Sequence, residues 1–303
     1  MSGVEIVPKR LIVSDTCISK APEGVPIIPL HIIWPDKQDQ LDSEFSENPE
    51  KFYEKMQSFM DKGFPPPTTT QPSIFEFTEL YTELYRRGAR EIGSVHVMST
   101  KSGTFGNAVL AAREVMAEPE YHDMKILAMD SGAVSLAQLF QVETAVNEQK
   151  EGASLDEINK ILMRNAEKDI SLYVAIETFK YLWYSGRVSG LAATLGDRAN
   201  LKVIVRLKHN NLERHQITKG MEHAKQRIVD NLREDIDTRK ALPSHVGVIY
   251  TRYPEIGEEL KVLLGDILRE PGVGFAGSAE AGALLGIHAG PGAGALAALW
   301  ADA

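Results

Sequence analysis

The stretch IGSVHVMSTKSGT (residues 92–104) decides the expected fold, because an apolar run ends abruptly in hydroxyl residues and glycine. Residues 92–98 are typical of a buried strand, and the triplet Ser102-Gly103-Thr104 follows its carboxyl end. Apolar residues then recur at helical spacing from Phe105 to Met116, which predicts a helix. A strand that leads directly into a helix is the repeating unit of a parallel sheet covered by helices.

Two more apolar runs in the first half have the same form. Residues 11–13 end in Ser14-Asp15, and residues 125–129 end in Asp130-Ser131. Helix-start signals separate these strands: Asn48 followed by Pro49, Ser73 with Glu76, and Ser154 with Glu157. In parallel sheets ligands bind beyond the carboxyl ends of the strands. We therefore expect a binding site where these hydroxyl and carboxyl residues converge.

The second half has a different pattern. Strands are predicted at residues 172–176, 203–207 and 246–250, followed by a helix at about 255–269 and a tail rich in glycine and alanine. A new helix start after Gly152 indicates a soft domain boundary near residues 150–170. The length of 303 residues is consistent with two domains or one large α/β unit.

Composition excludes several classes of protein. The 33 basic and 42 acidic residues give a net charge of −9, which argues against nonspecific nucleic-acid binding and against attraction to anionic lipid surfaces. The single cysteine, Cys17, forms no intramolecular disulfide, and we expect a reducing, cytoplasmic location. No signal peptide is expected at residues 1–10, and no run reaches the roughly 18 apolar residues of a membrane span.

Three motifs carry the chemistry. In PPPTTTQPS (residues 65–73) the prolines stiffen the backbone, so that Thr69 and Thr70 are either part of a rigid loop or ligand contacts. Ser102-Gly103-Thr104 either caps a helix or offers free N–H groups to a carboxylate or phosphate. His288, before a glycine-rich loop, is either a turn residue or a donor to a carboxylate.

Other site classes are not supported. The G-x-G-x-x-G match at residues 272–277 follows a helix and Pro271 instead of a strand, and we reject it as a dinucleotide motif. There is no P-loop sequence, no zinc-ligand spacing among the histidines, and no G-x-S-x-G elbow. We expect no metal and no cofactor.

Taken in order, these motifs resemble the DegV family of bacterial fatty-acid-binding proteins, the acyl-carrying subunits of fatty acid kinase. The resemblance covers nearly the whole chain and is carried by residues 14–16, 28–30, 69–73, 99–104, 130–131, 181–182, 185–189 and 288–292. It implies an N-terminal α/β domain (1–165) with a mainly parallel sheet, a C-terminal α/β domain (166–303) with a mixed sheet and helices, and a fatty acid buried between them.

The resemblance also implies the site. Thr69 and Ser102 would hold the carboxylate, with Thr70, Gly103 and Thr104 beside them and His288 close by. These are neutral groups, and a head-group site without arginine would leave the carboxylate reactive toward a phosphoryl donor.

A separate ATP-binding kinase subunit would phosphorylate the acid, with Arg187 in a docking role. An acyltransferase would then use the acyl phosphate for phospholipid synthesis. The chain itself is expected to be a lipid carrier and not an enzyme.

Two alternatives stay open, and departures from the family pattern support the first of them. Ala289 replaces a threonine after the histidine, and the segment His209-Asn210-Asn211-Leu212 lacks the family's glycine turn with its basic pair. One alternative is a lipid-sensing protein without kinase coupling. The other is a small-molecule phosphotransferase of related α/β fold.

Overall fold

The N-terminal half is built on a parallel four-stranded sheet. The computed structural model describes residues 7–18, 20–188 and 200–300. The strand order is β2-β1-β6-β7, and every neighbouring pair is parallel, as the sequence predicted. The strands are β1 (Arg10–Asp15), β2 (Ile27–Ile28), β6 (Glu91–His96) and β7 (Lys125–Asp130).

Helices cover both faces of this sheet. One face packs on α2 (Ile74–Arg86) and α3 (Thr104–Ala117), and the other on α4 (Leu136–Lys150) and α5 (Leu155–Arg164). The predicted capping boxes at Ser73 and Ser154 do begin α2 and α5. Each satisfies backbone N–H groups that have no partner inside the helix.

The C-terminal half is built on a six-stranded sheet of order β10-β9-β8-β13-β11-β12. All neighbouring pairs are antiparallel except β11 and β12, so the sheet is mixed, as expected. The strands are β8 (Ile170–Ile176), β9 (Leu201–Leu207), β10 (Leu212–Lys219), β11 (His245–Tyr250), β12 (Gly274–Glu280) and β13 (Gly294–Leu299).

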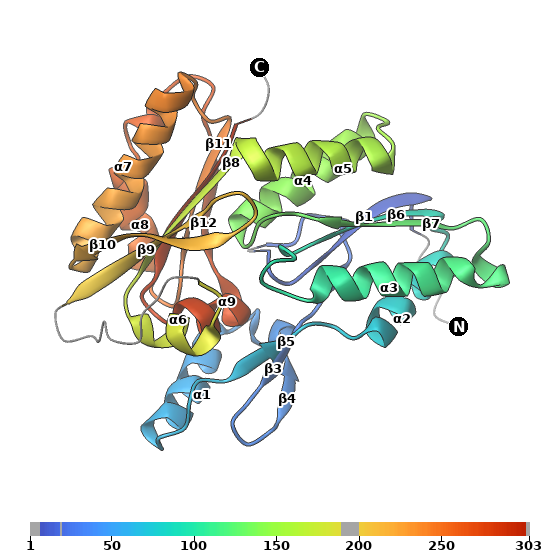
Figure 1. Ribbon diagram of the computed structural model, residues 1–303, viewed down its shortest axis with the longest axis horizontal. Helices are drawn as coiled ribbons and strands as arrows, with labels where there is room; N and C mark the ends of the chain where they lie inside the picture. The colour runs from blue at the N-terminus through green and yellow to red at the C-terminus, as the bar shows by residue number, and fades with distance from the viewer. Residues whose placement is uncertain (1–6, 19, 189–199, 301–303) are drawn as a thin grey trace.

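Two helices, α7 (Met221–Arg239) and α8 (Pro254–Leu263), cover the outer face of the six-stranded sheet (Figure 1). On the inner face α4 contacts β8, β11 and β13, so α4 lies between the two sheets (Figure 1). The helix predicted at 255–269 was too long. Past Gly265, a residue that weakens helices, only a short 3₁₀ turn follows at Ile267–Arg269.

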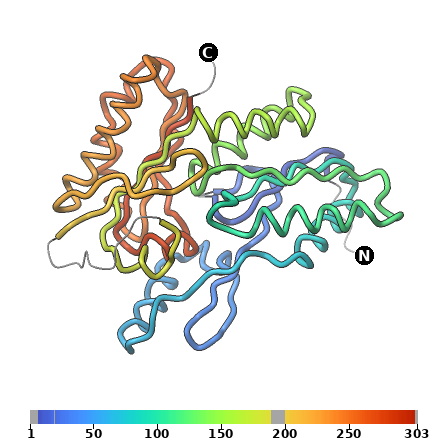
Figure 2. Tube along the Cα trace, viewed as in Figure 1, coloured from blue at the N-terminus to red at the C-terminus, as the bar shows by residue number. Residues whose placement is uncertain are grey.

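A segment from the N-terminal half crosses to the C-terminal half. It contains β3 (His31–Ile33), β4 (Asp39–Leu41), the 3₁₀ turn Asp42–Phe45, α1 (Pro49–Asp61) and β5 (Thr68–Thr70). The three strands form a small antiparallel sheet of order β4-β3-β5. In Figure 2 this blue segment lies beneath the yellow and red C-terminal elements. It packs there through an aromatic cluster that includes Trp34, Phe52 and Tyr181.

The glycine- and alanine-rich tail holds more structure than its composition indicated. It contains β12, α9 (Gly282–Ala289) and β13, and β13 occupies the centre of the six-stranded sheet. Because alanine is a weak strand former, the sequence GALAAL did not predict a central strand. The domain boundary at 165/166 falls in the helical turn Asn165–Asp169 before β8, and it stays a prediction.

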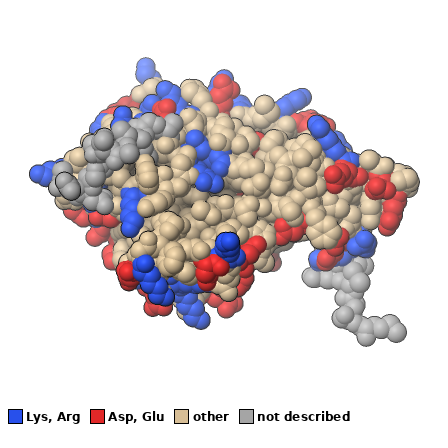
Figure 3. Space-filling model, turned by 60° about the horizontal axis from the view of Figure 1, so that its bottom comes forward, with Lys and Arg blue, Asp and Glu red and all other residues tan. Residues whose placement is uncertain are grey.

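Charged side chains of both signs are visible on the face shown in Figure 3. That face is mostly uncharged at its centre, and basic and acidic side chains are mixed toward its edges. Within the described parts of the chain, no helix combines the length and apolar character that a membrane crossing requires.

Candidate functional site

A cavity of about 210 Å³ lies between the two halves of the molecule. Its walls are mainly aliphatic, with Leu30 and Val97 from the N-terminal half and Leu172, Val174 and Ile249 from the six-stranded sheet. One water molecule occupies about 30 Å³ in the liquid, so the space exceeds the needs of a few waters. An apolar ligand fits these walls better than a polar one.

Several polar side chains also line the cavity, among them Gln71, Lys101, Ser135 and Thr251. Five more are residues predicted from the sequence: Thr69, Thr70, Ser102, Arg187 and His288. We call these five residues the polar end. They come from four separate elements, and the structure brings them together from positions up to 219 residues apart: Thr69 Oγ1 lies 3.1 Å from His288 Nε2.

The rigid loop before α2 delivers Thr69 and Thr70 as part of β5. Thr69 pairs with Ile32 and Thr70 with His31 on β3. Adjacent residues of a strand point to opposite faces, and accordingly Thr69 is half-buried whereas Thr70 is exposed. The contact with His288 therefore belongs to Thr69, and Thr70 lies at the edge of the cavity.

The Ser102-Gly103-Thr104 triplet forms the start of α3. Ser102 Oγ accepts a hydrogen bond from the Thr104 N–H at 3.3 Å and lies 2.8 Å from Thr104 Oγ1. A side chain at Gly103 would come within 2.9 Å of the Gln71 amide nitrogen, so glycine lets this loop meet the β5 loop. Ser102 lines the cavity, whereas Thr104 is fully buried and is not among the lining residues.

His288 occupies the last turn of α9. Burial, with the nearby positive charge of Arg187, lowers the pKa of His288 to about 3. The imidazole is therefore neutral at physiological pH, with one nitrogen as donor and one as acceptor. Its Nδ1 atom is buried and has no hydrogen-bond partner among the residues that the structure describes.

Arg187 corrects one expectation. The sequence suggested a head-group site made of neutral groups without arginine, but Arg187 lines the cavity just after α6 (Phe179–Ser185). Gly186 ends that helix in a left-handed conformation (φ 63°), and the Arg187 guanidinium donates to the Ser185 carbonyl at 2.6 Å. A positive charge is thus held at the polar end. The motif residue Ser189 lies outside the described residues.

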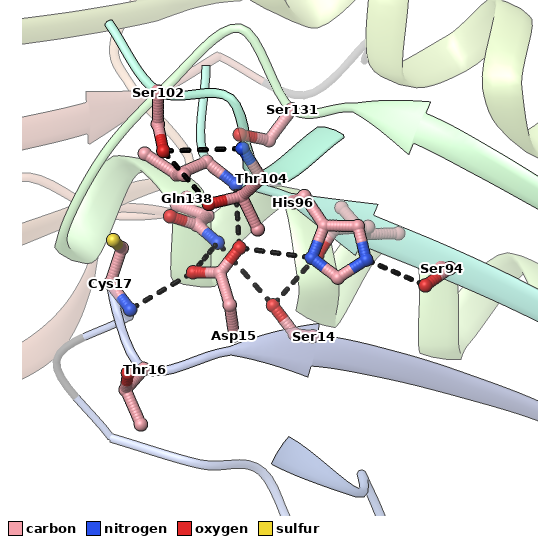
Figure 4. A network of polar contacts seen from close by, with 12 residues as sticks. Ser14, Asp15, Thr16, Cys17, Ser94, His96, Ser102, Thr104, Ser131 and Gln138 are labelled. Carbon is pink, nitrogen blue, oxygen red and sulfur yellow. Dashed lines mark hydrogen bonds and ion pairs between the residues drawn. The ribbon is translucent and has the colours of Figure 1, made fainter. Parts of the chain in front are cut away.

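A buried network lies behind the cavity, at the carboxyl ends of β1 and β6 (Figure 4). Asp15, which is fully buried, accepts hydrogen bonds from the N–H groups of Cys17 (2.9 Å) and Val97 (2.9 Å), both of which line the cavity. It also contacts His96 Nδ1 at 3.0 Å and Gln138 Nε2 at 3.1 Å.

Burial opposes the ionisation of Asp15, but the hydrogen bonds from His96, Val97 and Gln138 and the interaction with the His96 ring outweigh it, and its pKa is lowered. Asp15 therefore fixes two loops of the cavity wall at once. Asp15 belongs to one of the motifs at the strand ends, but no individual role was predicted for it. Its position at the end of a predicted strand was the available signal.

The segment that departs from the family pattern forms the tip of the β9–β10 hairpin. His209 and Asn210 both have positive φ (48° and 54°), as a two-residue type I′ turn requires. The tip reaches the N-terminal half, where Asn210 Nδ2 donates to Asp130 Oδ2 at 3.0 Å and Thr100 Oγ1 donates to the Asn210 carbonyl at 2.8 Å. This hairpin joins the two halves beside the cavity.

Other site classes receive no support from the geometry. Residues 274–277 of the rejected glycine motif belong to the edge strand β12. Among residues 7–18, 20–188 and 200–300, no three His, Cys, Asp or Glu side chains are grouped so as to hold a metal ion. The sulfhydryl of Cys17 lines the cavity, but burial and nearby Asp15 and Asp42 raise its pKa and keep it protonated.

Comparison with known proteins gives one consistent family. A family model described as "Uncharacterised protein, DegV family" matches residues 14–300. A "Fatty acid-binding protein" of Thermotoga maritima is 30% identical over 210 residues, which cover 69% of this chain and 69% of that protein.

Two solved structures have the same fold. The crystal structure of DegV from Bacillus subtilis, described as a fatty acid binding protein, is 26% identical, covers 96% of this chain and 99% of that chain, and has a TM-score of 0.77. A stearic acid-binding protein of Eubacterium ventriosum is 19% identical, covers 95% and 97% of the two chains, and has a TM-score of 0.82. At 19% identity, the similarity to this second structure shows the fold alone.

Proposed function

Since the chain belongs to the DegV family, we propose that it binds one long-chain fatty acid in the cavity between its two halves and presents the carboxylate to a separate kinase subunit. The observation that carries the proposal is a cavity with mainly aliphatic walls that also holds the contact between Thr69 and His288, with Ser102 and Arg187 among its lining residues. Apolar walls with a few polar groups match an amphipathic ligand with one acidic head.

The acyl chain supplies most of the affinity in this proposal. Burial contributes about 0.8 kcal/mol per methylene, so about 14 methylenes contribute about 11 kcal/mol before ordering costs. The walls offer branched aliphatic side chains such as Val97, Val174 and Ile249. The polar end then has to fix the head group and to avoid leaving a buried charge without a partner.

The head group has donors of two kinds. The hydroxyls of Thr69 and Ser102 and the neutral His288 offer hydrogen bonds, and Arg187 offers a positive charge. We assign the carboxylate to the hydroxyls and to His288. Arg187 lines the same cavity near His288, and we assign it to contact with a phosphoryl group or with the partner that carries it.

The proposed reaction takes place on the kinase subunit's ATP. A carboxylate oxygen attacks the terminal phosphorus, ADP leaves, and an acyl phosphate forms on the acid held by this chain. An acyltransferase then uses the acyl phosphate for phospholipid synthesis in the cytoplasm. The chain is a carrier in this scheme and supplies no nucleotide site of its own.

A second candidate, a lipid sensor without kinase coupling, rests on the hairpin tip. His209 and Asn210 replace the family's glycine turn and basic pair, and they contact Thr100 and Asp130 of the same chain. A tip engaged within the molecule is less available to a partner.

Three measurements test these proposals. Mass spectrometry of the purified, denatured protein should release a fatty acid in a one-to-one ratio, and an empty cavity together with no binding of added palmitate would refute the carrier function. The isolated chain should not turn over ATP, and turnover would favour a phosphotransferase.

The third measurement separates carrier from sensor. The loaded protein, mixed with its cognate kinase subunit and ATP, should give an acyl phosphate that hydroxylamine traps as a hydroxamate. Arg187→Ala should lose this product while it keeps the bound lipid. A loaded wild-type protein that yields no hydroxamate would favour the sensor.

A further inference from the structure

The inner face of the six-stranded sheet has an unusual distribution of side-chain size. A row of paired residues crosses β9, β8, β13 and β11 in the order Val205, Val174, Ala295 and Ile249. All four line the cavity. Alanine therefore stands in the middle of a row whose other members are branched.

The same contrast continues along β13. On its inner face β13 carries Ala295 and Ala297, and Ala293 precedes the strand next to Thr251. Residues on the outer face of β13, such as Leu296, pack against α7 and α8 instead. Short side chains on one strand between longer ones on its neighbours make a trough that runs along β13.

The trough starts near the polar end. Ala293 lies five positions after His288, and the hydroxyl of Thr251 donates to the carbonyl of Gly290 at 2.6 Å and accepts from the Ala293 N–H at 2.8 Å. From Ala293 to Ala297 the strand advances four residues, or roughly 13 Å. An extended acyl chain whose head lies at the polar end has this length of trough before it.

Helix α4 closes the other end. In the next inner row Leu172 pairs with Ala297, and Ala297 pairs with Gly247. A side chain at Gly247 would lie 2.3 Å from Leu136 Cδ2, so Leu136 rests directly on the sheet there. Ala297 and Leu136 are both buried and, unlike Ala295, neither is among the cavity-lining residues, so they lie beyond the end of the cavity.

We propose that the acyl chain lies in the β13 trough, and that Ala295 as its floor and Leu136 as its end wall determine the length of chain that the protein accepts. This inference rests on the proposed function, because it requires a fatty acid in the cavity. It adds that chain length is read by one strand and one helix, which belong to different halves of the molecule.

Opposite substitutions test the two residues. The measured quantity is the dissociation constant for a series of saturated acids: laurate, myristate, palmitate, stearate and arachidate. For each protein, affinity should rise by about fourfold per added methylene until the chain reaches the end wall, and then stop rising. Ala295→Leu raises the floor and should move this break to a shorter acid. Leu136→Ala removes the end wall and should move it to a longer one.

Matched variants keep the test decisive. Leu139→Ala makes the same change one turn further along α4, away from Gly247, and should keep the wild-type break; Ala295→Val replaces Ala295→Leu if the larger side chain prevents folding. If affinity stops rising at the same acid in wild type, in Leu136→Ala and in the Ala295 variant, the inference is overturned, although fatty-acid binding itself would stand. A wild-type protein that binds none of the acids would instead refute the proposed function itself.

Discussion

Replacing Asp15 with asparagine tests whether the buried network holds the cavity wall. The carboxylate accepts four hydrogen bonds, from the N–H groups of Cys17 and Val97 and from the side chains of His96 and Gln138. Asparagine is the same size but has one acceptor oxygen. If its amide NH₂ group lies where Oδ2 of Asp15 lies in the wild type, it faces the Val97 N–H, and two hydrogen-bond donors then oppose each other.

The expected cost follows from burial. Asp15 and His96 are both inaccessible to solvent. An unsatisfied buried N–H costs about 1–3 kcal/mol, and a hydrogen bond to a charged group contributes about 1.5–3 kcal/mol. These figures overlap because they count some of the same bonds, so we expect Asp15→Asn to lower the free energy of unfolding by about 3 kcal/mol at pH 7.

The pH dependence has a definite sign. Because the pKa of Asp15 is lowered in the folded protein, its stabilisation is present above the unfolded value of about 3.9 and is lost as the pH falls through the folded value. The difference between wild type and variant should therefore persist from pH 7 to pH 5 and shrink in stronger acid.

Urea unfolding followed by tryptophan fluorescence measures this difference. The control is Asp156→Asn, which removes a carboxylate whose exposed ion pair with Lys125 contributes at most about 1 kcal/mol. If Asp15→Asn unfolds within about 1 kcal/mol of wild type, as the control should, the network does not stabilise the fold in the way argued here.

Three further predictions concern the polar end and the hairpin. Ser102→Ala should weaken fatty-acid binding by about tenfold or more, the value of one hydrogen bond to a charged group, while the acyl-chain dependence of the affinity stays unchanged; titration with palmitate and myristate checks both, and unaltered palmitate affinity contradicts the assignment. The pKa of His288 is lowered to about 3 in the folded protein. Below about pH 6.5 the imidazole therefore binds a proton in the unfolded chain but not in the folded one, so the free energy of unfolding decreases as the pH is lowered from 7 to 5. Urea titrations should show that, between pH 7 and pH 5, the free energy of unfolding decreases by about 2 kcal/mol less in His288→Gln than in wild type. Equal decreases would mean that His288 is not held neutral. Asn210→Gly keeps the left-handed turn but loses the hydrogen bond to Asp130, so a bound fluorescent fatty acid should dissociate about tenfold faster in stopped-flow displacement. His209→Gly is the control: its side chain makes no hydrogen bond within the described part of the chain, and the variant should release the acid at the wild-type rate.

Local signals predicted much of the fold because they act within a few residues. The capping boxes at Ser73 and Ser154 and the Asn48 cap each satisfy N–H groups one turn away, and all three helices begin where expected. The parallel order of the first sheet followed from strand–helix alternation. These features depend on spacing and on the chemistry of neighbours in the chain.

Signals failed where long-range packing overrides local preference. Half of the residues of β13 are alanine, yet it is the third strand in from the β12 edge of the six-stranded sheet, because β8 and β11 pair with it on both sides. The hairpin tip at His209 and Asn210 was noticed as a departure from a pattern, but its contacts with Thr100 and Asp130 depend on how the two halves meet.

Spacing and residue type alone predicted the strand–helix alternation, the helix starts, and the threonine, serine and histidine residues of the polar end. The packing of the two halves was needed to bring Thr69 to His288, to place Thr104 behind Ser102, and to make Arg187 line the same cavity. The physical reason is that hydrogen-bonded turns are closed over a few residues. A cavity instead exists only where side chains from distant segments stop short of one another, as Ala295 of β13 and Val97 of the N-terminal half do.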